Sequence, residues 1–315
     1  MPIDEEWIGQ QRRVSNRLEK RSVKLYCGSS TFSKLPPASL DAVFTDPPYF
    51  ANVQYAELID FCYIWLRRLA IDRNGFLSRH STRNENELTG NDTMERGLTN
   101  FTEGLAAVFI NMAHALKPGA PLAFTYHHNT IDAYLPVIVA ILDAGLTCSA
   151  SIPCPSEMGA SIHINGTGSS IVDTVFVCRS TGSVPRHLIV SKPEEIAKLV
   201  KNDLEHLRTG NLKPTRGDIR CIAYGHLARL AVWNLRKNWN LGISTPEKLR
   251  AAAQAIEKLG GWPGVEQHLA DTLSYVSQHQ NWVAREDQTS YGDKPRVCPN
   301  FGPRYSDGAS GSVTP

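Results

Sequence analysis

The chain has 315 residues, a hydrophobic content of 42% and a formal net charge of +2. This composition is ordinary for a globular protein with a sizeable core, and so small a net charge does not by itself argue for nucleic-acid binding. The sequence has no apolar run long enough to span a membrane, and its charged first twenty residues are unlike a signal peptide.

The seven cysteines are scattered along the chain and form no Cys-x-x-Cys pair, so neither a zinc ribbon nor a redox pair is predicted. Dispersed thiols in odd number favour a reducing cytoplasm. No histidine or carboxylate lies at a spacing that predicts a metal site.

The chain begins with a predicted helix with a basic face over residues 5–20, within an N-terminal segment 1–22. Strands are predicted at 23–27 and 41–45. The second strand ends in an apolar run, Ala42-Val43-Phe44, which we expect to be buried.

The tetrad Asp46-Pro47-Pro48-Tyr49 follows this run directly. Neither proline has an N–H to donate to a strand ladder, so the chain must leave the sheet as a stiff loop. The loop carries one carboxylate and two aromatic rings, Tyr49 and Phe50. A simpler interpretation is a Pro-Pro turn with an incidental aromatic residue.

This loop has the groups needed for chemistry on a planar ring that carries an amino group. The Asp46 carboxylate and the Pro47 carbonyl can each accept one N–H bond from the amino group. The two bonds pull the nitrogen lone pair out of ring conjugation, and orientation toward a methyl donor supplies further rate. Tyr49 and Phe50 offer faces on which a base that has left its duplex stack can be held.

Residues 23–50 resemble the amino-methyltransferases of DNA, whose pattern is strand, Gly-Asp, Leu-Pro loop, strand, then Asp-Pro-Pro-Tyr. The continuation through 51–69 is similar to the large adenine-specific DNA methylases with an N-terminal DUF1156 region. The resemblance covers about residues 22–180 and weakens toward 235. It implies methylation of adenine N6 in DNA from S-adenosyl-L-methionine, with Asp46, Pro47, Pro48 and Tyr49 in the catalytic loop and Asp46 also near the cofactor.

The resemblance also assigns further residues. Phe50, Asn52 and Tyr55 would shape the rim of the base pocket. The Gly-Asp pair of the family falls on Gly28 and Ser29, so the carboxylate expected beside the cofactor is missing.

The glycine fingerprint for the cofactor, Asp-Pro-Phe-x-Gly-x-Gly after a strand, is absent. The later Gly166-Thr167-Gly168 follows no apolar strand, and we interpret it as a loop. The expected fold is therefore a Rossmann-like methyltransferase sheet that is incomplete on its N-terminal side. A second polypeptide could supply the missing motif.

A helix is predicted over residues 54–70, where aromatic and aliphatic residues recur at helical spacing. We expect this apolar stripe to lie in the core rather than to stack on bases. Residues 72–97 are polar and predict either a lid or target-reading segment, or disordered surface.

Basic residues gather in two groups, and the second follows the catalytic loop, where phosphates would lie. A solvated helix face explains either group equally well. The groups are Arg12, Arg13, Arg17, Lys20, Arg21 and Lys24, then Arg67, Arg68, Arg73, Arg79 and Arg83.

A helix over 99–116, a Lys-Pro-Gly turn and a strand over 121–126 come next, and resemble a crossover of class I methyltransferases. His127 and His128 end that strand, and we expect one of them to line the pocket; an ordinary strand-end histidine is the alternative.

A helix over 131–144 and strands over 147–152 and 171–178 complete the pattern. By the resemblance, these last two strands form a hairpin that completes the sheet edge. Alternating strands and helices predict an α/β fold, with a mostly parallel sheet and helices on both faces. Such sheets bind ligands outside the carboxyl ends of their strands, so the tetrad and the histidines should share one rim.

The catalytic domain is predicted to span 23–184, a helical extension 185–284, and a disordered tail 285–315. Helices are predicted over 192–209, 218–238 and 246–284, packed on the sheet or on another chain. Three functions remain open. The chain is an adenine-N6 methyltransferase or its catalytic half, an incomplete subunit that binds nucleic acid or a partner, or an enzyme acting on cytosine N4 or RNA.

Overall fold

The computed structural model describes residues 2–4, 22–24, 26, 28–32, 35–51, 54–69, 77–84, 87–90, 96–156 and 170–280. Four sequence predictions lie outside these residues: the helix over 5–20, the role of Asn52, the loop at 166–168 and the tail from 285 onward.

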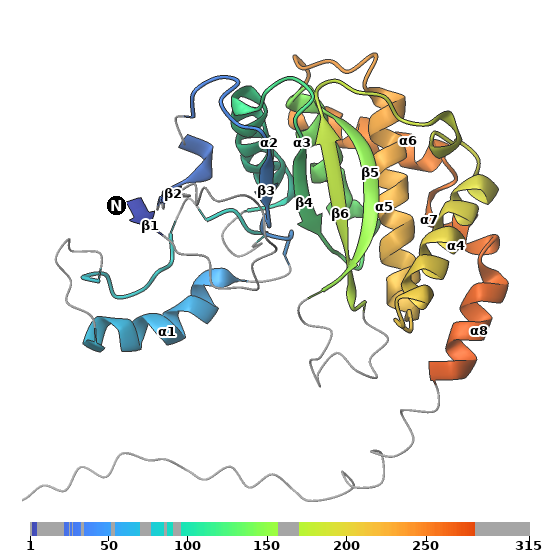
Figure 1. Ribbon diagram of the computed structural model, residues 1–315, viewed down its shortest axis with the longest axis horizontal. Coiled ribbons are helices and arrows are strands. Elements are labelled where there is room, and N and C mark those ends of the chain that lie inside the picture. Colours follow the sequence, from blue (N-terminus) through green and yellow to red (C-terminus); the bar gives the residue numbers. More distant parts are fainter. Residues whose placement is uncertain are drawn as a thin grey trace, which may run out of the picture.

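The protein is an α/β structure built on a four-stranded mixed sheet (Figure 1). The strands are β3 (Val43–Thr45), β4 (Leu122–Tyr126), β5 (Thr147–Pro155) and β6 (Val172–Arg179), in the order β3-β4-β6-β5. β3 and β4 are parallel, whereas β6 runs antiparallel to both β4 and β5. Four of the five predicted strands are confirmed in this sheet. A mostly parallel sheet was the wrong expectation, because β6 enters between its two neighbours as half of a hairpin with β5.

Three helices cover the sheet: α2 (Leu98–Ala115), α3 (Leu135–Asp143) and α5 (Arg216–Leu235). α2 ends at the predicted turn, where Gly119 adopts a positive φ of 78° that favours glycine. α3 continues a 3₁₀ turn, Ile131–Tyr134, and every residue from Leu135 to Leu142 is buried.

Helices α2, α3 (with the 3₁₀ turn before it) and α5 all contact the same face of the sheet. The Phe109 ring of α2 lies 4.9 Å from the Phe124 ring, and the Tyr134 ring lies 6.4 Å from the Phe176 ring. On α5, a Cβ atom added at Gly225 would lie 2.8 Å from Thr174. Phe124 and Phe176 are paired across the strands, and Thr174 is two residues from Phe176, so these side chains share one face.

The opposite face of the sheet is largely open. Phe44 and Ala123 are paired on this face, and Phe44 is 79% exposed; Ile152, paired with Val175, is 50% exposed. The sequence predicted helices on both faces and a buried end to β3. Both expectations are wrong for the described residues, because α2, α3 and α5 all cover the other face.

The C-terminal helices share one core with the sheet. They are α4 (Pro193–Thr209), α5, α6 (Thr245–Lys258), α7 (Gly261–Gln267) and α8 (Ala270–Gln280). The single helix predicted over 246–284 is divided in the structure, because Gly260 adopts a φ of 91° and ends α6. The predicted C-terminal helical extension therefore packs on the sheet, and its helix α5 is one of the helices that cover the sheet face.

The N-terminal elements lie away from the main sheet. β1 (Pro2–Asp4) pairs antiparallel with β2 (Ser22–Lys24) in a separate two-stranded sheet. The strand predicted at 23–27 thus exists in part, but it does not join the four-stranded sheet as the resemblance implied.

Helix α1 (Tyr55–Leu69) is confirmed and projects from the carboxyl end of β3, apart from the sheet (Figure 1). Its apolar stripe was expected in the core, and this expectation is wrong. The stripe lies in solvent; its larger members are Tyr55 at 40% exposed, Leu58 63%, Ile59 50%, Trp65 54%, Leu66 51% and Leu69 81%.

Candidate functional site

The Asp-Pro-Pro-Tyr loop lies where β3 ends, at the carboxyl edge of the sheet. Asp46 is exposed, Pro47 is buried and Tyr49 is half-buried. Thr45 is paired with Phe124, so Asp46 comes level with Thr125 on the neighbouring parallel strand. The loop is therefore fixed to β4 on one side and open to solvent at its carboxylate.

The Asp46 carboxylate is oriented through one of its oxygens. Its Oδ1 atom accepts hydrogen bonds from the Tyr49 hydroxyl at 3.2 Å and from the Thr125 hydroxyl. The described residues place no donor on Oδ2. Asp46 thus has a fixed orientation, it is exposed, and its second oxygen accepts no hydrogen bond from the described residues.

The two rings of the loop are anchored differently. The Tyr49 ring lies 5.2 Å from the Tyr126 ring at 58°, and the Phe50 ring meets Phe101 edge-on at 5.3 Å. The Phe50 N–H donates to the Tyr126 hydroxyl at 3.4 Å, and that hydroxyl donates to the Ala133 carbonyl at 2.8 Å. Phe50 was predicted to offer a stacking face, but its ring packs toward α2 instead.

Burial raises the pKa of Tyr49, and the charges of Asp173 and Asp46 raise it further, although the Thr125 hydrogen bond acts the other way. Burial likewise raises the pKa of Tyr126. Both hydroxyls therefore stay protonated at neutral pH and act as donors.

The structure brings His127 and His128 to the same rim as the loop. Burial lowers the pKa of His128, and backbone hydrogen bonds with Thr130 and Phe50 oppose that shift. The Nδ1 atom of His128 accepts from the Thr130 N–H at 3.1 Å. His128 therefore touches the loop through Phe50, as the shared rim predicted.

His127 faces the interior. Its Nδ1 atom lies 3.4 Å from the Cys221 sulfur on α5, and burial lowers its pKa. Burial also raises the pKa of Cys221 to about 11, so the thiol stays protonated and is a poor nucleophile. His127 is thus fixed against α5, and His128 is the better candidate for contact with a substrate.

Sequence reasoning missed two residues at this rim, Thr125 and Asp173. Asp173 begins β6, whose reversed direction carries its amino end to the carboxyl edge of β4, and its charge acts on Tyr49. Thr125 could have been found by aligning the parallel strands, since it stands level with Asp46. Asp173 could not be found, because the expected hairpin of the last two strands does not say which of them lies beside β4.

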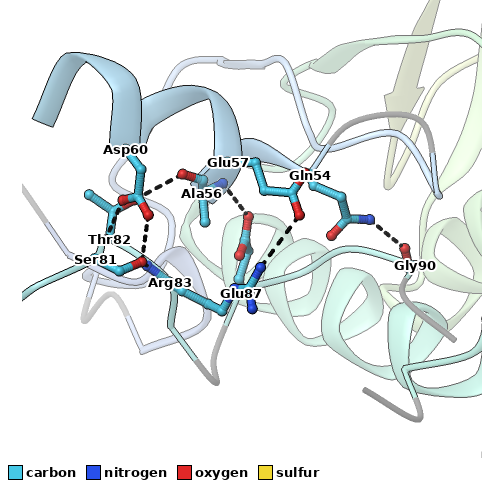
Figure 2. Close-up of polar contacts among 9 residues, drawn as sticks. All are labelled: Gln54, Ala56, Glu57, Asp60, Ser81, Thr82, Arg83, Glu87 and Gly90. Atoms are coloured by element: carbon cyan, nitrogen blue, oxygen red, sulfur yellow. Dashed lines mark hydrogen bonds and ion pairs between the residues drawn. The ribbon is translucent and has the colours of Figure 1, made fainter. Parts of the chain in front are cut away.

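A segment that we call the strap, residues 77–84 and 87–90, runs along α1 and holds it at the rim (Figure 2). The Asp60 carboxylate accepts from the hydroxyls of Ser81 and Thr82, both at 2.6 Å. The Glu87 carboxylate accepts from the Ala56 N–H at 3.1 Å, an otherwise free donor at the start of α1. The described part of the polar insertion is therefore an ordered support for α1.

The strap also reaches the loop. The Gln54 side chain donates to the Gly90 carbonyl at 2.9 Å (Figure 2). A Cβ atom added at Gly90 would lie 2.7 Å from the Phe50 ring. Tyr55 begins α1 close enough to Asp46 for its pKa to be raised, first by burial and then by that charge. Tyr55 thus lies at the rim, as predicted.

Gly28 and Ser29 are exposed, and the Ser29 carbonyl accepts from the Phe32 N–H at 3.2 Å. The carbonyl of the adjacent Ser30 accepts from the Asn111 side chain at 3.0 Å. Asn111 is ten residues along α2 from Phe101, the residue that meets Phe50, which corresponds to about 15 Å along a helix. The cofactor role of Gly28 and Ser29 stays a prediction.

Within the described ranges, no group of three or more histidine, cysteine or carboxylate side chains is placed to hold a metal ion. The helices of those ranges include none that is both long and apolar enough to cross a membrane. Comparisons of the chain with protein-family models, curated proteins and solved structures found no match.

Proposed function

We propose that this chain is the catalytic half of an S-adenosyl-L-methionine-dependent amino-methyltransferase that acts on adenine N6 in DNA. The observation that carries the proposal is the Asp46 carboxylate at a strand end, where Tyr49 and Thr125 hold one oxygen and no described residue donates to the other. A fixed acceptor of this kind suits an exocyclic amino group, which must be oriented before it can attack.

In this proposal the second Asp46 oxygen accepts one N–H of the amino group, and the Pro47 carbonyl accepts the other. Tyr49 is anchored by its hydroxyl, so its ring is held in place to support the base. His128 lies against Phe50 and limits the pocket on the β4 side. These contacts hold the base so that the nitrogen lone pair points away from the protein, toward the donor.

The finer fold assignment, half of a class I methyltransferase sheet, belongs to the same proposal. It is supported by the Lys-Pro-Gly turn that leads from α2 into β4, and by the β5–β6 hairpin at the sheet edge. The Asp-Pro-Pro-Tyr sequence alone suits cytosine N4 or RNA equally well, since each target presents a planar amino nitrogen. The basic residues that follow the loop in the sequence favour nucleic acid.

The described residues do not form a complete site for S-adenosyl-L-methionine. The donor needs a glycine turn after a strand that lets the backbone approach its methionine part. The rim offers Asp46 and Asp173, but the candidate pair Gly28 and Ser29 lies near the far half of α2. We therefore derive no step for the donor from these residues.

A second candidate is a subunit that is inactive alone and is completed by another polypeptide. The observation that favours it is the free edge of β3, which pairs only with β4 among the described strands, together with Phe44 at 79% exposed. A strand added at that edge would satisfy its backbone groups and bury Phe44.

The role of Asp46 is tested by methyl transfer from isotopically labelled donor to adenine-containing duplex DNA, with any completing polypeptide supplied. Asp46→Ala should abolish transfer. Asp41→Ala is the matched control, because Asp41 is an exposed carboxylate at the other end of the same strand, paired with Lys117. Unchanged activity in Asp46→Ala would remove the proposed role.

Calorimetry with S-adenosyl-L-methionine on the isolated chain separates the two candidates. Micromolar binding corresponds to about 8 kcal/mol and requires a formed pocket, so it would argue against the incomplete subunit. Absence of binding alone, with binding restored when a completing polypeptide is added, would favour it.

A further inference from the structure

Ala51, which follows the Asp-Pro-Pro-Tyr loop and Phe50, has a left-handed backbone with a φ of 51°. A residue with a Cβ atom is disfavoured in this conformation by roughly five- to thirtyfold relative to the right-handed one. Such a residue persists only where its surroundings hold it there, and residues of this kind gather at functional sites. Ala51 is therefore a point of backbone strain beside the loop.

The strap packs directly against Ala51. A Cβ atom added at Gly90 would lie 2.8 Å from the Ala51 nitrogen and 2.9 Å from the Ala51 Cβ atom, so the two backbones are in contact. Gly90 is buried, and the preceding Thr89 is only 1% exposed. The strap therefore restricts the backbone of Ala51 at this point.

The strap also holds the chain after Ala51, where α1 begins. The Gln54 side chain donates to the Gly90 carbonyl at 2.9 Å (Figure 2). The Ala56 N–H donates to the Glu87 carboxylate at 3.1 Å, and a carboxylate at the first turn of a helix also offsets the positive end of the helix dipole. Two hydrogen bonds to the strap therefore fix the position at which α1 starts.

The strap is itself fixed to the core through α2. A Cβ atom added at Gly104 of α2 would collide with the Leu88 side chain, so Leu88 lies directly on the helix backbone. The Arg96 guanidinium, two residues before α2, donates to the carbonyls of Asn84 at 3.4 Å and Glu87 at 3.1 Å. The strap therefore joins the start of α1 to a helix of the core.

We propose that Ala51 is a strained hinge, and that Glu87 and Gln54 are positioning residues that hold the hinge left-handed through the strap. A hinge residue is one whose backbone angles absorb a movement of the chain. Without these bonds, Ala51 relaxes and displaces Tyr49, whose hydroxyl holds the Asp46 carboxylate. The hinge follows from the backbone and its contacts, and only its effect on catalysis rests on the proposed function.

Hydrogen–deuterium exchange at the Phe50 amide tests the hinge without an assay of activity. The Phe50 N–H donates to the Tyr126 hydroxyl, so Glu87 does not bond it directly. Glu87→Ala removes the acceptor of the Ala56 N–H and should speed exchange at Phe50 at least about fivefold, the lower limit of the conformational preference that is released. Glu87→Gln keeps an acceptor oxygen and should retain most of the protection.

Ala51→Gly separates release of the hinge from a general loss of stability. Glycine adopts a positive φ without steric cost, so a loop that carries it has no strain to release. In the double variant Ala51→Gly, Glu87→Ala, exchange at Phe50 should return to within about twofold of the rate in Ala51→Gly alone. Gln54→Ala removes the other bond to the strap, and Ala51→Gly should suppress its effect in the same way.

Glu103→Ala is the matched control. The Glu103 carboxylate is exposed on α2 and accepts from the Thr245 hydroxyl at 2.8 Å, so this variant loses one hydrogen bond outside the strap. Exchange at Phe50 should not change. Circular dichroism and thermal melts check that every variant is folded.

Methyl transfer, with any completing polypeptide supplied, tests the effect on the site. Glu87→Ala should lower kcat about tenfold and change KM less than about twofold, because Asp46 loses its orientation while the rest of the rim stays intact. Adding Ala51→Gly should restore most of kcat. A wild-type chain that transfers no methyl group would overturn the proposed function, and the exchange rates would still decide on the hinge.

Three results would overturn the hinge proposal. Unchanged exchange at Phe50 in both Glu87→Ala and Gln54→Ala would show that the strap does not hold the hinge. Faster exchange that Ala51→Gly fails to reduce would show that backbone strain does not move the loop. In an active wild-type enzyme, a kcat that does not respond to Glu87→Ala would show that the hinge does not orient Asp46.

Discussion

The Thr125 hydroxyl on β4 donates a hydrogen bond to the Asp46 carboxylate at the end of β3. Thr125→Val keeps the shape of the side chain and removes this donor, so Asp46 loses part of its orientation. A hydrogen bond to a charged group contributes about 1.5–3 kcal/mol, so we expect kcat in the methyl-transfer assay to fall roughly ten- to hundredfold. Thr125→Ser keeps the hydroxyl and should retain most of the activity. Equal rates in the valine and serine variants would show that Thr125 does not orient Asp46.

Gly90 of the strap lies directly against the loop, where an added Cβ would be 2.7 Å from Phe50 and 2.8 Å from the Ala51 nitrogen. Gly90→Ala should therefore displace Phe50 or the backbone and destabilise the protein by about 1–3 kcal/mol, measured by urea denaturation. Gly28→Ala is the control, because a Cβ there meets no atom within 4 Å. If Gly90→Ala were as stable as the control, the strap backbone would have to shift away from Phe50 and Ala51 at little cost in free energy.

A buried ion pair joins α3 to α6. The Lys248 ammonium lies 2.9 Å from the Asp143 carboxylate, both side chains are nearly buried, and the Trp239 indole donates to the same carboxylate at 2.8 Å. Asp143→Ala leaves the lysine without its partner and should lower the free energy of unfolding by about 3–5 kcal/mol. The exposed pair of Lys117 and Asp41 provides the comparison, and Asp41→Ala should cost less than about 1 kcal/mol. Similar losses in the two variants would refute this difference.

His226 on α5 is enclosed by three elements. Its Nε2 lies 2.8 Å from the Asp203 carboxylate on α4, and its Nδ1 lies 3.2 Å from the Ser151 hydroxyl and 3.4 Å from the Arg229 guanidinium. Burial lowers the pKa of His226, and the Arg229 charge adds to this, although Asp203 opposes it. The imidazole is therefore held neutral in the folded protein.

This arrangement predicts a loss of stability in mild acid. The unfolded chain takes up a proton on His226 as the pH falls through about 6.5, while the folded chain does not, so unfolding becomes easier. The pKa values of His127 and His128 are lowered as well, so they act in the same direction. Thermal melts should show lower midpoints at pH 5.5 than at pH 7.5, and His226→Gln should reduce the difference. A melting temperature that does not change over this range would contradict the prediction.

The central fold could be read from the sequence because its signals are local. Apolar runs bounded by Gly and Pro gave the strands of the sheet, and helical periodicity gave α1, α2 and α5. The exposure of the apolar stripe of α1 could not be predicted. Helical periodicity shows that a helix has an apolar side, but it does not show whether that side packs in the core of the same chain. The division between α6 and α7 depends on the positive φ of Gly260, which the apolar pattern on either side conceals.

The site was predictable only as far as one loop and one strand end. Two prolines after a strand force Asp46 out of the sheet, and β4 must end near it if the two strands are parallel neighbours. The contribution of Asp173 depends on β6, and not β5, lying beside β4, and no local sequence signal gives that strand order. The strap was similarly unpredictable, since its role rests on hydrogen bonds such as that between Asp60 and Thr82.

The reversed direction of β6 has an electrostatic consequence for the rim. It brings the Asp173 carboxylate to the edge where Asp46 already lies, and both charges act on Tyr49. Two anions at one edge attract a cationic group such as a sulfonium and repel the phosphates of a nucleic-acid backbone. In the proposed methyltransferase, a polynucleotide would therefore approach with its sugar–phosphate chain held outside, and an uncharged base would enter at this edge.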